Sequence, residues 1–116
     1  MAWIDMAVAP LGNVGESNEE SWEFSEVVVS ATGNSIIIPP GCNAAGVTVK
    51  RTSGTYVVQA TTDKIYTIKN DAASVTWIDW DYGSMAVNAQ DEFSISASAV
   101  RIITTGGTSE IKVSAK

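Results

Sequence analysis

Two carboxylates and three aromatic side chains lie within residues 77–82, at a spacing that suits a binding surface. Asp79 and Asp81 are two residues apart in a segment rich in β-forming residues, so on a strand both side chains project to one face. Trp77 shares that face. The residues that alternate with them define the natural core face: Ile78, Trp80 and Tyr82.

An aromatic ring beside two acids can stack on a sugar ring while the carboxylates accept hydrogen bonds from its hydroxyl groups. The candidate glycan contact consists of Trp77, Asp79, Asp81 and Tyr82. Two nearby carboxylates could also hold Ca²⁺, although Ca²⁺ takes six to eight oxygen ligands and the sequence has no D-x-[DN]-x-[DN]-G loop. The remaining interpretation is that Trp77 packs against a neighbouring strand or subunit while the acids stay hydrated. We expect no metal site and no cofactor.

Catalytic chemistry is disfavoured by the residue types. The chain has no histidine, which removes Ser-His-Asp triads and His-containing zinc sites. A glycosidase dyad needs two carboxylates across a cleft, for which a 12.2 kDa β-domain has little room. Cys42 has no histidine to act as its base, so we expect an ordinary reduced thiol, as in a reducing cytoplasm. The sequence predicts a non-enzymatic protein.

The negative charge is concentrated in the first part of the chain. The net charge is −6, and residues 1–49 hold six acidic and no basic residues, whereas residues 50–116 hold seven of each. Such a chain repels phosphate backbones, so no nucleic-acid partner is expected. The dense acidic stretch at 16–23 is either a solvated loop or an arm that docks on a basic partner. Candidate partner-docking residues are Trp3, Ile4, Glu16, Glu19, Glu20, Trp22 and Glu23.

The only basic cluster comprises Lys50, Arg51, Lys64 and Lys69, and the acidic stretch could pair with it between subunits. The 116 residues suit a single domain, with residues 1–26 as an N-terminal arm or first strand and residues 27–116 as the β-sandwich. No apolar run is long enough to cross a membrane and no secretion signal opens the chain, so no membrane partner is expected.

The elements that would position these residues are nearly all strands. Short β-branched runs recur between turn residues, and about nine or ten strands predict an antiparallel β-sandwich or jelly-roll-like fold. Runs 27–29 and 36–38 flank Gly33 and Asn34, and runs 100–104 and 111–113 flank a Gly-Gly pair; both patterns predict hairpins. Further strands are expected at residues 47–50, 56–58, 65–68 and 75–80.

Two further patterns bear on packing. Residues 17–20 match a helix capping box, but Trp22 and Phe24 alternate into the valines at 27–29, which favours a strand there. The continuous apolar run 36–38 predicts a strand covered on both faces. Four tryptophans and few charges indicate more apolar surface than one small sandwich hides, so we expect self-association or a partner.

The C-terminal part resembles small all-β virion proteins of tailed bacteriophages. The resemblance rests on residues 76–83 (Thr-Trp-Ile-Asp-Trp-Asp-Tyr-Gly), 99–102 (Ala-Val-Arg-Ile) and 105–108 (Thr-Gly-Gly-Thr), followed by a short last strand. Such proteins often end in an "AVR" strand, a Gly-Gly hairpin and a valine-bearing strand. The similarity covers roughly the last 40 residues, and residues 45–70 only in style.

The resemblance implies a structural role. Proteins of this kind include capsid decoration (cement) proteins, which commonly sit as trimers on the shell and clamp neighbouring subunits. The implied partners are the major capsid protein and further copies of this chain, and the implied location is the capsid surface of the virion, after synthesis in the bacterial cytoplasm. N-terminal segments often supply shell contacts, which here means residues 1–26. Tail or receptor-binding tips with glycan recognition are the alternative.

Overall fold

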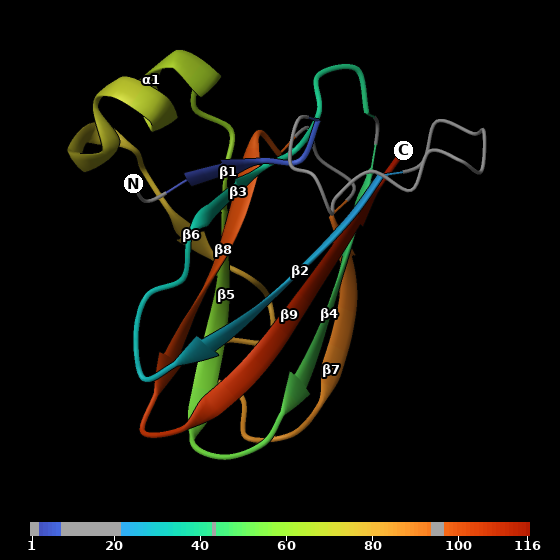
Figure 1. Cartoon of the computed structure of the whole chain (residues 1–116), viewed down its shortest axis with the longest axis vertical. Coiled ribbons are helices and arrows are strands. Elements are labelled where there is room, and N and C mark those ends of the chain that lie inside the picture. The colour runs from blue at the N-terminus through green and yellow to red at the C-terminus, as the bar shows by residue number, and fades with distance from the viewer. Residues whose placement is uncertain (1–2, 8–21, 43, 94–96) are drawn as a thin grey trace.

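The computed structural model describes residues 3–7, 22–42, 44–93 and 97–116, which form two β-sheets packed face to face (Figure 1). Sheet A has the strand order β1 (Trp3–Asp5), β3 (Ser35–Ile37), β8 (Ala99–Thr105), β5 (Thr55–Thr61) and β6 (Ile78–Asp79). Sheet B has the order β2 (Trp22–Val29), β9 (Thr108–Ala115), β4 (Ala45–Arg51) and β7 (Ala89–Phe93).

The strand order within the two sheets is that of a jelly roll. Setting β1 aside, sheet A runs β3-β8-β5-β6 and sheet B runs β2-β9-β4-β7, so most connections carry the chain from one sheet to the other. Neighbouring strands are antiparallel, except that β1 lies parallel to β3. Eight strands in two such sheets make a double-sheet jelly roll. The predicted all-β sandwich is confirmed.

The main core lies between the sheets and follows the two-residue period of the strands. On β4, Val47 and Val49 are fully buried, while Thr48 and Lys50 between and after them point outward. The same alternation on β9 buries Ile111 and Val113. Burying such β-branched side chains supplies the driving force for packing the sheets.

A second, smaller core lies on the outer side of sheet A. Helix α1 (Ile65–Asn70) packs on this side, at the end of the sandwich where the helix stands in Figure 1, and the exposed 3₁₀ turn η2 (Ala72–Ser74) follows it. Ile37, Ile68 and Ala99 are buried there, beneath partly buried side chains that include Trp3 and Trp77. The run 36–38 is therefore covered on both faces, as predicted, because Ile36 and Ile38 belong to the main core.

The two predicted hairpins are wrong. Strand β2 pairs with β9 and β3 pairs with β8, so the valines at 27–29 and the isoleucines at 36–38 lie in different sheets. Likewise β8 and β9 belong to opposite sheets. Both turns reverse the chain, with Ser30 and Gly106 at positive φ. After each turn, however, the next strand joins the opposite sheet instead of pairing with the strand before the turn.

The strands predicted at 65–68 and 75–80 are also corrected. Residues 65–70 form helix α1, which places Ile65 and Ile68 three apart on the side that packs on sheet A. Only Ile78 and Asp79 of the second segment pair in a sheet, and the chain turns directly afterwards. None of the helices among the described residues is long and apolar enough to cross a membrane.

Candidate functional site

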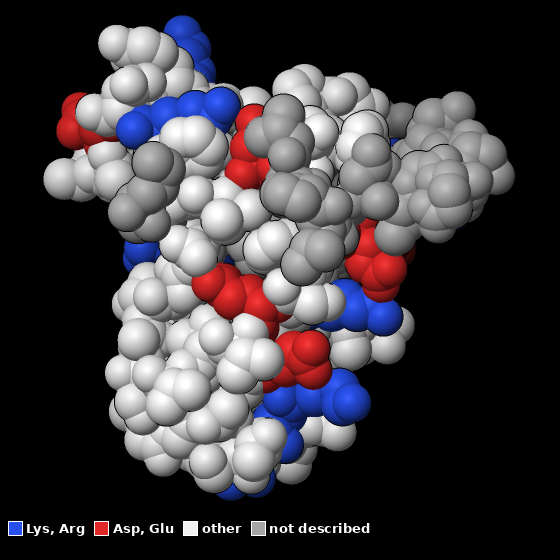
Figure 2. Space-filling view, viewed as in Figure 1, with Lys and Arg blue, Asp and Glu red and all other residues white. Residues whose placement is uncertain are grey.

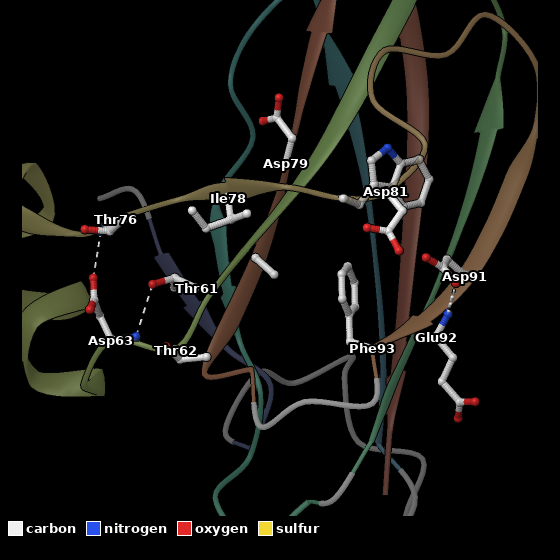
Figure 3. A pocket seen from close by; sticks show the side chains of 12 residues that line it. Thr61, Thr62, Asp63, Thr76, Ile78, Asp79, Asp81, Asp91, Glu92 and Phe93 are labelled. Atoms are coloured by element: carbon white, nitrogen blue, oxygen red, sulfur yellow. Dashed lines mark hydrogen bonds between the residues drawn. The ribbon is translucent and has the colours of Figure 1, made fainter.

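A hollow of about 440 Å³ opens where sheet A ends at β6 and sheet B ends at β7 (Figure 3). This volume is typical of ligand pockets, which measure roughly 300–1,000 Å³. Its lining comprises Ala60, Thr61, Thr62, Asp63, Thr76, Ile78, Asp79, Trp80, Asp81, Asp91, Glu92 and Phe93. Both sheets contribute, because β6 and β7 are the edge strands on the same side of the sandwich.

The floor of the hollow is apolar. Phe93, at the end of β7, packs partly against the main core and turns its ring into the hollow (Figure 3). Ile78 is 64% exposed although it is a large apolar side chain. Trp80 is buried, and its indole N–H donates to the carbonyl of Gly83 at 2.7 Å, which fixes the turn after β6.

The rim of the hollow is acidic. Asp63 accepts a hydrogen bond from the backbone N–H of Thr76 at 2.6 Å, and Asp79 accepts one from the Gln59 amide at 2.8 Å. Figure 3 shows the carboxylates of Asp81 and Asp91 turned toward one another above the Phe93 ring. Asp91 also accepts the backbone N–H of Glu92 at 2.8 Å.

The chain does not neutralise this rim with its own cations. All seven Lys and Arg residues lie in the described part of the chain, and none is within 4 Å of the five carboxylates that line the hollow. The two ion pairs among the described residues join Lys69 to Asp5 and Lys112 to Glu23. The hollow thus combines an apolar floor with uncompensated negative charge.

The alternative of a calcium site at Asp79 and Asp81 has no geometric support. Within the described ranges, no three carboxylate or thiol side chains lie close enough together to hold a metal ion. The acids of the hollow are spread around its rim, and in Figure 3 Asp79 and Glu92 point away from Asp81. Ca²⁺ requires oxygen ligands that converge at about 2.3–2.6 Å.

The predicted glycan contact is divided between two places. Asp79 and Asp81 line the hollow, but Trp77 does not: the guanidinium of Arg101 lies 4.3 Å from its ring centroid. Burial lowers the pKa of Arg101, and its Nε donates to the Gln59 side chain at 2.8 Å. Tyr82 sets its ring edge-on to Trp80 at 5.0 Å, and its hydroxyl donates to the carbonyl of Gln90 at 3.2 Å.

The predicted core face of this segment is also corrected. Of the expected trio, Trp80 alone is buried, whereas Ile78 and Tyr82 are 64% and 46% exposed. The alternation fails because the paired strand is only two residues long, and the turn that follows changes the direction of later side chains.

The predicted docking residues lie on three different parts of the chain. Trp3 and Ile4 belong to β1, where Lys69 Nζ lies 4.6 Å from the Trp3 ring centroid and 3.2 Å from Asp5. Trp22 and Glu23 begin β2, so residues 22–26 pair with β9 and the expected boundary after residue 26 falls inside a strand. Glu16, Glu19 and Glu20 lie outside the described residues.

Strand β2 also presents an apolar surface. It is an eight-residue edge strand, and Val27 and Val29 on its outer face are 60% and 62% exposed. Figure 2 shows acidic and basic side chains interspersed over this side of the molecule, with an uncharged area toward the end of β2. At the other end of β2, Glu23 pairs with Lys112 at 2.9 Å and raises the pKa of that lysine.

The residues of the expected basic cluster and Cys42 do not line the hollow. Lys50 and Arg51 end β4, at the opposite end of the sandwich from the helix that carries Lys69, so the expected basic cluster does not form (Figure 1). Cys42 lies half-buried in the loop after β3, and burial raises the pKa of its thiol. Such a thiol is a poor nucleophile at neutral pH.

No protein-family model and no curated protein matches the sequence. Two solved structures of oxalate oxidase are similar in fold, each with a TM-score of 0.51 at 8% identity, covering 82% of this chain and 41% of that chain. The chain thus spans about two fifths of the oxalate oxidase chain. A Bacillus endospore appendage structure aligns over 83% of this chain and 86% of its own, at 11% identity and a TM-score of 0.45. At these identities the similarity to oxalate oxidase shows the fold alone.

Proposed function

We propose that this protein is a non-enzymatic virion structural protein, a capsid decoration protein that stabilises a bacteriophage shell by binding across its subunits. The observation that carries the proposal is the β2 edge with its two exposed valines. Long edge strands offer unpaired backbone groups and are usually protected by charges, proline or a covering segment. The outer face of β2 instead ends in Val27 and Val29, which suits a surface that a partner covers.

The size of the domain is compatible with several simultaneous contacts. Its described structure exposes 6267 Å², and two contacts of about 800 Å² each would use about a quarter of that surface. A trimer on a shell would make two such contacts to its own copies and further ones to the major capsid protein. Individually weak contacts become durable when a particle presents many of them together.

A stabilising role also agrees with the chemistry of the hollow. A carboxyl group that acts as a general acid near neutral pH is normally held in a buried, apolar site. Of the five carboxylates that line the hollow, Asp79, Asp81 and Glu92 are exposed, and Asp63 and Asp91 are only partly buried. The jelly-roll fold occurs in viral capsid and lectin domains, so it is compatible with the proposal but does not assign it.

The direct test is the copy number of this chain in purified virus particles, measured by quantitative mass spectrometry against the major shell protein. We expect hundreds of copies per particle, located on the capsid. A few to a few dozen copies would place the chain at the neck or tail and favour receptor-binding glycan recognition instead. Absence from the particles would overturn the virion proposal.

The contribution of β2 is tested with a pair of matched double variants. Val27→Lys/Val29→Lys adds two positive charges to the exposed valine surface, and Ala72→Lys/Ala73→Lys adds two at exposed positions on η2. We expect the β2 variant to stay folded and lose binding to particles that lack the protein, while the η2 variant binds normally. Equal binding of both would show that β2 is not the docking surface.

A further inference from the structure

The hollow at β6 and β7 has the composition of a groove for a cationic side chain. A long basic side chain has an apolar stem and a charged head, and it lies best where apolar and acidic surfaces meet. Here Ile78 and Phe93 form the apolar floor, and the carboxylates of Asp81 and Asp91 stand above the Phe93 ring (Figure 3). Among the described residues, no Lys or Arg side chain pairs with them.

The arrangement favours an organic cation over a metal ion. The described acids do not converge into a group of three that could hold a metal. An arginine guanidinium instead presents five N–H donors in a plane, so it can reach carboxylates on two sides at once. Its flat face also stacks on an aromatic ring, and Phe93 offers such a ring next to the two carboxylates.

From this geometry, we propose that the hollow binds an arginine side chain of a partner polypeptide. The guanidinium lies between Asp81 and Asp91 on the face of Phe93, and the aliphatic stem covers Ile78. This accounts for an isoleucine that lines the hollow and is 64% exposed. A polypeptide also suits the position, because β6 and β7 are edge strands that leave room for an extended segment beside them.

The inference goes beyond the proposed function and does not depend on it. Sheet B has β2 at one edge and β7 at the other, so the hollow and the exposed valines lie on opposite edges of the same sheet. One domain with a contact at each edge can join two neighbours. The arginine site can nevertheless be tested on the isolated protein, whether or not the chain is part of a virion.

The test is a titration of the full-length ¹⁵N-labelled protein with the peptide acetyl-Gly-Arg-Gly-Arg-Gly-amide, followed by residue-resolved amide shifts. The comparison ligands are the isosteric citrulline peptide, the lysine peptide, spermidine and a neutral oligosaccharide. We expect the arginine peptide to shift signals at residues 61–63, 76–81 and 91–93. Its affinity should be higher than the affinities of the lysine peptide, the citrulline peptide and the sugar. Added salt should weaken its binding.

Three variants sharpen the result. Asp81→Asn/Asp91→Asn removes two charges from the hollow, and Asp71→Asn/Glu110→Gln removes two elsewhere, so both change the net charge equally. We expect the first to weaken arginine-peptide binding about fivefold to tenfold and the second to leave it within about twofold. Phe93→Leu keeps an apolar side chain but removes the ring, and should reduce the preference for arginine over lysine by about twofold to fivefold.

Several outcomes would overturn the proposal. Shifts spread over the whole acidic surface, or equal weakening by both double variants, would mean non-specific charge attraction. Equal or tighter binding of spermidine would make the site one for free polyamines, and binding of the sugar or citrulline peptide would make it a neutral polar site. No shift at about 10 mM peptide would mean that the hollow has no useful affinity for arginine.

Discussion

Residues 27–29 and residues 36–38 are triplets of the same chemical kind, yet the fold uses them in opposite ways. Val27 and Val29 are 60% and 62% exposed on either side of a buried Val28. The three isoleucines at 36–38 are all at most 5% exposed. β-Branched runs of this kind predict strands in both places. The run alone does not indicate whether another element covers the outer face of the strand.

The cover comes from elements far away in the sequence. Helix α1 and the segment that carries Trp77 pack on the outer side of sheet A, so Ile37 is enclosed with Ile68 and Ala99. No element in the described ranges covers the outer side of sheet B, so the valines of β2 face outward. The difference shows that burial on the outer face depends on long-range packing rather than on the triplet itself.

The largest expected effect comes from removing the enclosed member of the isoleucine triplet. Ile37→Ala takes away a fully buried side chain and leaves a cavity beneath α1, which should lower the free energy of unfolding by about 2–5 kcal/mol. The matched change Val29→Ala should cost about 0.5 kcal/mol or less. Urea unfolding of both variants checks this. Equal losses would mean that the exposure difference has no energetic consequence.

The next effect comes from removing part of the cover. Trp77→Ala deletes a half-buried ring that packs against the second core and faces Arg101, so we expect a loss of about 1.5–2.5 kcal/mol, roughly half that of a fully buried tryptophan. The double variant with Ile37→Ala should lose less than the sum, because both changes affect one small core. A double-mutant cycle from urea unfolding tests the coupling, and strict additivity would contradict a shared cover.

Much of the fold follows from local pattern, but the connections do not. The period-two alternation of Val47, Thr48, Val49 and Lys50 predicts a half-buried strand, and the structure has one. Turn residues such as Gly33 and Gly106 predict that the chain reverses, but they do not predict which sheet the next strand joins. Reversals that stay in one sheet and reversals that cross the core use the same residue types, and the choice depends on the packing of the whole sandwich.

The helix at 65–70 shows a second limit. Ile65, Tyr66, Thr67 and Ile68 have high β-propensity, and the segment is too short for a clear 3.6-residue period. Packing of Ile65 and Ile68 on sheet A overrides that propensity. Short helices of this kind receive most of their stability from tertiary contacts.

The candidate site was only partly accessible from the sequence. The spacing of Asp79 and Asp81 singled out two residues that line the hollow, but Trp77 and Tyr82 pack elsewhere. Asp63, Asp91 and Phe93 were missed, because they come from the end of β5 and from β7 and meet only when the two sheets pack. The signal available was the alternation of Asp91 and Phe93 with Glu92 on a short strand.

A moderate effect is expected beneath the valine triplet. A Cβ atom added at Gly33 would lie 2.8 Å from a methyl group of Val28 and 3.3 Å from one of Ile102. Gly33→Ala should therefore displace the one buried valine of the triplet and lower the free energy of unfolding by about 1–2 kcal/mol. Combined with Val28→Ala, which removes the crowded methyl group, the loss should be smaller than the sum of the two single losses. Urea unfolding of the two variants decides, and an unchanged stability in Gly33→Ala would show that the contact relaxes freely.

The smallest effect on stability is expected at the two exposed valines, and it is the most informative for function. Val27→Thr/Val29→Thr keeps the β-branched shape, so the free energy of unfolding should change by about 0.5 kcal/mol or less. If a partner covers this surface, the same variant should weaken self-association or particle binding, as measured by light scattering and co-sedimentation, because two apolar contacts are lost. The threonine variant of β2 should therefore change association while leaving stability nearly unchanged, whereas Ile37→Ala should lower stability. A loss of more than about 1 kcal/mol in the threonine variant would show that the valines are already covered within one chain, which would remove the basis for docking at β2.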